Sequence, residues 1–170
     1  MKRTARGFTL VELLIVIAII GILAAVLWVT IQPLELLKRS RDAARMQDLS
    51  NLQQAINVAV AETTSPTLAE VICKDIVVLP CLGDTDDLNS TKADGSGWVK
   101  VDVSSSTSYS LSSLPVDPSH PTVIYNYKAD ATGWEINATL ESTMYASKMA
   151  NDGGGDIAKY EIGTNLGLIP

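Results

Sequence analysis

A long apolar run near the N-terminus limits what this chain can fold into. It covers residues 8–31, contains one charged residue, Glu12, and contains no proline. A helix of this length rises about 36 Å, which is enough to cross a bilayer core of about 30 Å. We therefore expect residues 8–31 to form a membrane-spanning helix.

The residues before the apolar run give that helix a direction. Residues 1–7 contain Lys2, Arg3 and Arg6 and no acidic residue. Such positive charge stays on the cytoplasmic side of a membrane, so the chain after the helix is expected on the other side. A secretory signal has a shorter apolar core of about 7–15 residues, followed by a cleavage site of small residues. Because neither feature is present, we expect the helix to be retained as an anchor.

Glu12 is the unusual residue of this segment. A carboxylate inside a membrane helix costs on the order of 2.5–3.5 kcal/mol on insertion scales and by default marks a function. A cut between Gly7 and Phe8 would create an α-ammonium group about one helical turn from Glu12. Pairing with such an ammonium, most simply that of a neighbouring copy, would offset the cost of burying Glu12. The alternative is that Glu12 reaches the cytoplasmic face from an ordinary anchor.

These residues carry a resemblance to a known family. The basic leader, Gly7 and the sequence FTLVEL at residues 8–13 resemble the class III leader of type IV pilins and type II secretion pseudopilins. The resemblance implies that a membrane aspartyl prepilin peptidase cuts after Gly7 and methylates the amine of Phe8. It also implies that Glu12 neutralises the Phe8 amine of a neighbouring subunit during filament assembly.

The same resemblance indicates where the helix is easily unwound or bent. Gly21 matches a helix-weakening glycine of the family, whereas Val29 stands where the family often has proline, and the first proline here is Pro33. Proline removes one backbone donor. Since helix-forming sequence follows Pro33, we expect it to bend the helix without ending it.

Residues 32–63 continue the helical pattern with one apolar face. Apolar positions recur at three- and four-residue steps, which predicts an amphipathic helix packed on a head domain. They are Leu34, Leu37, Ala44, Leu49, Leu52, Ile56, Ala59 and Thr63. Arg39, Arg41 and Arg45 lie on the charged face, either in solvent or against acidic surfaces of neighbouring subunits. The chain thus divides into a leader (1–7), an apolar helix (8–31), its amphipathic continuation (32–63) and a head (64–170).

The head shows β-strand patterns. Residues 123–128 and 134–140 alternate in polarity around a glycine-containing turn at 129–133, which predicts an antiparallel hairpin. Residues 98–103 predict another strand, residues 76–79 are strand-like, and residues 159–162 predict a short last strand. The inner face of the hairpin is expected to pack on the helix through Trp134, Ile136, Ala138 and Leu140.

The expected fold class is α+β, with a long N-terminal helix against a small antiparallel sheet. The segment LPVDP at 114–118, the following Tyr-x-Tyr and the strand GWEI also resemble the heads of major pilins and pseudopilins. This second resemblance is less specific than that of the leader. It implies the pilin fold.

The two cysteines, Cys73 and Cys81, lie on the predicted outer side of the membrane. A cysteine pair outside the cytoplasm can oxidise, and closing so small a loop stabilises by about 2–3 kcal/mol in the chain-entropy model. We predict a disulfide. Free buried thiols are the alternative, and a zinc site is not expected because no histidine accompanies the pair.

No cofactor is expected, with one exception to be tested. Related pseudopilins hold Ca²⁺ in a late acidic loop, and the resemblance implies such a site at Asp117, Asp152 and Asp156. The acidic turn at residues 84–87 does not match an EF-hand loop and is read as an exposed turn.

An enzyme is not expected. The single histidine, His120, is adjacent to Ser119 on a proline-bounded turn, so the two lack the orientation of a nucleophile and its base. We also find no glycine-rich phosphate loop and no metal-binding helix motif in the sequence.

These observations favour a structural subunit of a type IV pilus that polymerises through its N-terminal helix and serves adhesion, motility or DNA uptake. One alternative is the major pseudopilin of a type II secretion system, and another is a single-pass membrane-anchored binding domain. The expected partners are copies of the chain, the prepilin peptidase, an inner-membrane platform protein, an assembly ATPase, and membrane lipid before assembly. The N-terminus starts in the cytoplasm, and the filament is then extracellular or periplasmic. The net charge of −6 argues against DNA binding through a basic face of the single chain, so any DNA binding is expected only for the assembled filament.

Overall fold

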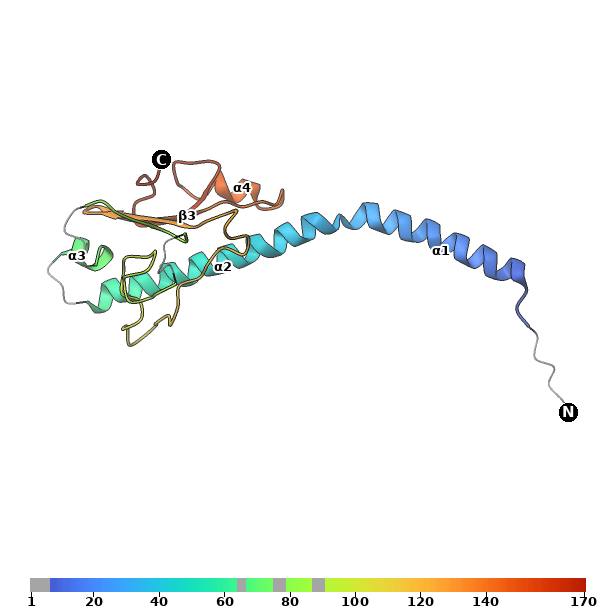
Figure 1. The fold of residues 1–170 in the computed structure, drawn as a ribbon. Coiled ribbons are helices and arrows are strands. Elements are labelled where there is room, and N and C mark those ends of the chain that lie inside the picture. The colour runs from blue at the N-terminus through green and yellow to red at the C-terminus, as the bar shows by residue number, and fades with distance from the viewer. Residues whose placement is uncertain (1–6, 64–66, 75–78, 87–90) are drawn as a thin grey trace. The chain divides into compact units, whose positions relative to one another are not determined.

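The computed structural model describes residues 7–63, 67–74, 79–86 and 91–170 (Figure 1). The chain separates into two compact units, Met1–Leu37 and Lys38–Pro170. Each unit is described by itself.

The first unit contains the apolar helix α1, Leu10–Ile31. It ends at Gln32, which adopts a left-handed conformation (φ 47°, ψ 69°), and the next helix begins at Pro33. Proline disfavours the α conformation for the residue before it and suits the first position of a helix. The structure thus differs from the expected bend: the helix is interrupted at Gln32, one residue before Pro33, and restarts at Pro33.

The helix α2, Pro33–Glu62, ends at the predicted place. The predicted stripe is buried at Leu49, Leu52, Ile56 and Ala59, whereas Leu34 and Leu37 remain 74% and 57% exposed. The predicted stripe is thus correct for the second half of the helix and wrong for its first half. The polar residues Asp42 and Arg45, predicted to lie on an outer face, are fully buried.

Four antiparallel strands form one sheet in chain order: β1 (Cys81–Asp84), β2 (Asn126–Asp130), β3 (Gly133–Ala138) and β4 (Tyr160–Gly163). Strands β2 and β3 form the predicted hairpin, with Asp130 paired to Gly133 across a two-residue turn. The side chain of Asp130 accepts hydrogen bonds from the backbone N–H (2.7 Å) and hydroxyl (2.6 Å) of Thr132 in that turn. Strand β4 confirms the last predicted strand to within one residue.

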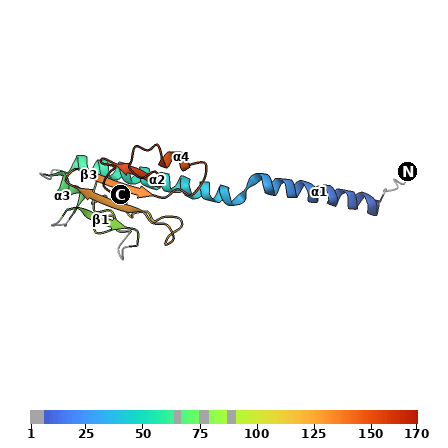
Figure 2. The ribbon, with the colours of Figure 1, turned by 90° about the horizontal axis from the view of Figure 1, so that it is seen from above.

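The core of the second unit lies between the sheet and α2, which run side by side in both views (Figures 1 and 2). Trp134, Ile136 and Ala138 alternate on the inner face of β3 and are at most 1% exposed. Leu140 is also buried, as predicted. Trp134, Ile136 and Ala138 belong to one apolar cluster with five residues of α2: Leu49, Leu52, Ala55, Ile56 and Ala59.

Residues 98–103 are not a strand, so that prediction is wrong. Their only ladder contact in the described part of the chain is an isolated bridge between Asp94 and Asp102. Backbone groups of this segment form hydrogen bonds with loops instead of with a strand. The backbone N–H of Lys74 donates to the carbonyl of Lys100 (2.8 Å), and the backbone N–H of Val103 donates to the carbonyl of Ala93 (2.9 Å). The alternating pattern reflects burial alone, since Trp98, Val101 and Val103 are 0% exposed.

Strand β1 was not predicted, and Gly83 explains its weak pattern. A Cβ at Gly83 would lie 2.1 Å from the carbonyl oxygen of Trp98, so only glycine fits there. Of the strand-like segment predicted at 76–79, residues 76–78 lie outside the described residues.

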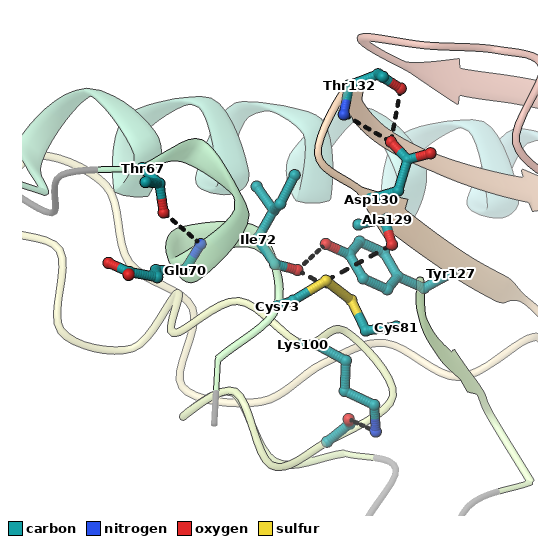
Figure 3. The surroundings of a disulfide bond; sticks show 11 residues. Thr67, Glu70, Ile72, Cys73, Cys81, Lys100, Tyr127, Ala129, Asp130 and Thr132 are labelled. Carbon is teal, nitrogen blue, oxygen red and sulfur yellow. Dashed lines mark hydrogen bonds between the residues drawn. A yellow bond between two sulfur atoms is a disulfide. The ribbon is translucent and has the colours of Figure 1, made fainter. Parts of the chain in front are cut away.

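A disulfide joins Cys73, which follows the short helix α3 (Leu68–Ile72), to Cys81 at the start of β1 (Figure 3). The hydroxyl of Tyr127 donates to the carbonyl of Ile72 at 2.6 Å beside it. The disulfide and this hydrogen bond connect the end of α3 to two strands of the sheet. A second short helix, α4 (Ala146–Met149), lies beside β4.

Candidate functional site

Thr9 and Glu12 form a reciprocal capping box at the start of α1. The backbone N–H and the hydroxyl of Thr9 donate to Glu12 Oε2 at 2.9 Å and 2.7 Å. In return, the backbone N–H of Glu12 donates to the Thr9 hydroxyl at 3.3 Å. One carboxylate oxygen of Glu12 is therefore held within its own chain, which lowers the cost of placing the charge near lipid.

Gly7 and Phe8 precede the helix and are exposed. Phe8 is 83% exposed, and a Cβ at Gly7 would meet no atom within 4 Å. The bond between them lies before the N-cap residue, so no helical turn protects it. The predicted cleavage position is thus accessible in this structure. Lys2, Arg3 and Arg6 lie outside the described residues.

The helix α1 buries none of its residues within the chain. Its apolar side chains are 45–79% exposed from Leu10 to Ile31. By length and composition it belongs to the one helical segment in the described part of the chain that is able to cross a membrane. Gly21 lies inside this helix and is regular in conformation, so its weakening role stays a prediction based on the poor helix propensity of glycine.

A buried ion cluster was not predicted from the sequence. The guanidinium group of Arg45 contacts Asp42 (2.8 Å), Asp117 (2.7 Å and 2.9 Å) and Glu141 (2.5 Å). Arg41 adds a second contact to Glu141 at 2.6 Å. Arg45 therefore binds acids of its own chain, and the prediction that it lies in solvent or against neighbouring subunits is wrong. Asp42 lies three residues before Arg45, but Asp117 and Glu141 are 72 and 96 positions away, and no local pattern connects these two to the helix.

The cluster shifts the pKa values of Glu141, Asp42 and Arg45 in the direction that favours their charged forms. Hydrogen bonds and charge from Arg41 and Arg45 lower the pKa of Glu141 to about 2. Burial opposes ionisation of Asp42, but hydrogen bonds from Ser142, from the Glu141 backbone and from Arg45 keep its pKa below the ordinary value. Arg45 likewise has a raised pKa despite its burial, because Asp117 and Glu141 bind it. The cluster is thus a structural clamp between α2 and two later segments.

The three residues proposed for calcium do not come together. Asp117 is bound to Arg45, whereas Asp152 accepts from the backbone N–H of Gly154 (2.9 Å) and Glu161 (2.8 Å). Asp156 accepts from Ala158 at 2.9 Å. Among the residues that the structure describes, no group of three or more His, Cys, Asp or Glu is placed to hold a metal ion. In this structure each of the three aspartates is held by partners of its own chain, and calcium binding stays a prediction.

His120 and Ser119 point to different partners. His120 Nε2 lies 2.8 Å from Asp86 Oδ1, and the Ser119 hydroxyl bonds to Glu141 at 3.2 Å. Each of the two side chains is thus held by an acidic residue of another segment. In the same acidic turn, Asp84 accepts from the backbone of Asp86 at 2.9 Å, while Asp87 lies outside the described residues.

A comparison with protein families matches the N-terminal part of the chain, which contains Gly7, Phe8 and the capping box. The family model of the prokaryotic N-terminal methylation motif matches residues 2–28. No curated protein and no solved structure matches the chain. The match includes Gly7, Phe8, Glu12 and most of α1. Residues 2–28 of this chain therefore carry a prokaryotic N-terminal methylation motif.

Proposed function

We propose that this chain is the structural subunit of a type IV pilus and that it polymerises through α1. One observation carries the proposal: the matched methylation motif coincides with an apolar helix that buries none of its residues in its own chain. Such a helix needs lipid or other apolar helices around it. A bundle of α1 helices from many copies provides the second environment.

Glu12 sets the register of assembly in this proposal. Thr9 holds Oε2 of Glu12, and Oε1 accepts no hydrogen bond from the described residues. After cleavage, the α-ammonium of Phe8 on a neighbouring subunit approaches that free oxygen. An ion pair is much stronger away from water than in it, so a copy in the wrong register leaves an unpaired charge in an apolar bundle.

The partners follow from the same proposal. A prepilin peptidase cuts between Gly7 and Phe8 and methylates the new amine. A platform protein and an assembly ATPase move the subunit from the membrane into the filament, and the head remains on the far side of the membrane. The chain has a structural role and is not an enzyme.

The first test is the intact mass and N-terminal residue of the protein isolated from native membranes. The proposal expects a chain that starts at Phe8 and is heavier by one methyl group. A chain that retains residues 1–7, in cells that process other prepilins, contradicts it. The membrane-anchored binding domain then becomes the better account.

A second test separates processing from assembly. We expect Glu12→Gln to be inserted and cut normally but to form no filaments, because the neutral amide cannot neutralise the Phe8 amine. Glu35→Gln is the matched control, since Glu35 is the other acidic residue in the first 37. Filaments made by Glu12→Gln at the level of the control would remove Glu12 from the mechanism.

The second candidate is a periplasmic pseudopilus of a type II secretion system, because pseudopilins share the motif. Electron microscopy of intact cells with antibody against the head distinguishes the two. Labelled filaments outside the cell support the pilus. Filaments found only after the envelope is opened, together with a secretion defect on deletion, support the pseudopilus.

A further inference from the structure

Two glutamates lie close together on the outer face of the sheet. Glu161 of β4 is paired in register with Asn137, two residues after Glu135 on β3. Side chains two apart on a strand share a face, so both glutamates lie on the face opposite Trp134 and Ile136. Glu135 is 0% exposed and Glu161 is 2% exposed. Buried carboxyl groups of this kind are rare without a partner.

Each glutamate uses one oxygen to bind a covering segment. Glu135 Oε2 accepts from the backbone N–H of Leu168 (2.7 Å) and Ile169 (3.0 Å) in the C-terminal segment. Glu161 Oε2 accepts from the backbone N–H of Asp156 at 3.1 Å, in the glycine-rich loop. The loop fits closely, since a Cβ at Gly154 would lie 1.8 Å from Glu161 Oε2. The two glutamates therefore hold both the C-terminal segment and the glycine-rich loop against the sheet.

The other oxygen of each glutamate is buried and has no hydrogen-bond partner. Two ionised carboxylates in this position would leave two buried acceptors unsatisfied and would repel each other. A single proton satisfies both oxygens, because a protonated carboxyl donates and an ionised one accepts.

We propose that Glu135 and Glu161 share one proton at neutral pH, and that this proton keeps the C-terminal segment (166–169) and the glycine-rich loop (151–156) closed over the sheet. The pair is a proton-dependent latch of the head. It involves no residue of the N-terminal motif, so its test is independent of the proposed function.

The surrounding charges place the proton on Glu161. On the side of β2, Lys128 stands directly opposite Glu135, and its Nζ donates to the carbonyl of Leu168. One positive charge and two backbone donors thus surround the Glu135 side of the pair. On the side of the loop, the negative charge of Asp152 faces Glu161, whose backbone N–H binds it.

The remaining charged groups around Glu161 lie on the loop and on α4. Asp156 contributes its N–H, and its carboxylate is directed to Ala158. Lys148 of α4 lines, with Glu161 and Asp152, an open cleft of about 590 Å³. Burial, then the hydrogen bond and charge of Glu135 and the charge of Asp152, raise the pKa of Glu161 to about 7.

The sign of the effect follows from this raised pKa. The folded head holds the proton more tightly than the unfolded chain, whose glutamate has a pKa near 4.5. The stabilisation is therefore complete below about pH 4.5 and is lost as the pH rises through about 7. Above that pH both carboxylates are charged, and their repulsion destabilises the packing of the C-terminal segment and the glycine-rich loop on the sheet.

Hydrogen–deuterium exchange of the full chain in detergent, at pH 5.5 and pH 8.5 and corrected for intrinsic rates, tests the latch. If opening exposes Glu161, we expect protection of peptides from residues 150–170 to fall by about thirtyfold over this range. Glu161→Gln should abolish the pH dependence, because its amide donates permanently to Glu135. Glu70→Gln, on α3, is the control and should behave as the unmodified protein.

Three results would overturn the latch: equal protection at both pH values, an unchanged pH dependence in Glu161→Gln, or restored protection at pH 8.5 on adding Ca²⁺. The last result would make the pair a cation site. If Glu161→Gln does not fold, ¹³C NMR titration of the carboxyl groups in the unmodified chain decides. A titration of Glu161 near neutral pH supports the latch, and one near pH 4.5 overturns it.

Discussion

Arg45 and Asp117 are joined by two hydrogen bonds, Nε to Oδ2 at 2.7 Å and Nη2 to Oδ1 at 2.9 Å, and neither side chain is exposed. The two parallel bonds fix the guanidinium plane against the carboxylate. This contact ties α2 to the turn that lies between β1 and β2 in the chain. The head therefore depends on a buried charge in addition to its apolar core.

Replacing Arg45 with alanine should destabilise the head by about 3–5 kcal/mol, because Asp42 and Asp117 are left buried without their cation. Urea unfolding of the full chain in detergent, followed by tryptophan fluorescence, measures this change. Arg41→Ala is the matched control. The Arg41 side chain is 33% exposed, and its loss should cost about 0–1 kcal/mol. Equal costs for the two variants would show that burial of Arg45 contributes nothing.

The stability of the head should fall in acid. Arg41 and Arg45 lower the pKa of Glu141 to about 2, so the contribution of Glu141 is present above its unfolded pKa near 4.5 and is lost as the pH falls toward 2. In Glu141→Gln, thermal unfolding should show a smaller loss over this window. A loss in Glu141→Gln as large as in the unmodified protein would assign the acid sensitivity to other groups.

The capping box should order the first turn of α1. In Thr9→Val, Glu12 loses the hydroxyl donor and its own N–H loses its acceptor, so amide exchange near Glu12 should accelerate. The hydroxyl of Thr30 bonds back to the carbonyl of Val26 within the same helix at 2.8 Å and caps nothing. Thr30→Val is therefore the control and should leave the first turn unchanged, while Thr9→Ser should preserve most of the protection.

The disulfide should stabilise the head through the unfolded state. Closing the loop between Cys73 and Cys81 reduces the conformational entropy of the unfolded chain. In the chain-entropy model this raises the free energy of unfolding by about 2.5 kcal/mol. Reductant should therefore lower the urea midpoint of the unmodified protein. A variant with both cysteines changed to serine should start at the lower midpoint and not respond to reductant. A response of the double variant would point to an effect unrelated to this bond.

The features that sequence predicted well are local ones. The fixed offsets of Gly7, Phe8 and Glu12 lie within two helical turns, and the continuous apolar run predicts α1 without reference to the rest of the chain. The hairpin of β2 and β3 is also local, since its turn joins neighbouring residues. Pro33 indicated that the helix is irregular near this position, and the residue with the left-handed conformation is Gln32.

The features that sequence missed depend on distant partners. Arg45 is buried because Asp117 and Glu141 reach it from 72 and 96 positions away. Residues 98–103 have a strand pattern, but strand identity needs a neighbouring strand, and here loops bind their backbone. Glu135 and Glu161 look like ordinary outward residues of alternating strands, and only the C-terminal segment and glycine-rich loop bury them.

The order of the strands in the sheet, β1-β2-β3-β4, has a consequence for how the sequence of this head can vary. Only β2 and β3 are joined by a tight turn. The connection from β1 to β2 and that from β3 to β4 each leave the sheet and return to an adjacent strand. Insertions or deletions at exposed positions of these two excursions leave every strand pairing unchanged. The outer surface can therefore diversify there, while the buried Trp98, Val101 and Val103 of the first excursion keep their places in the core.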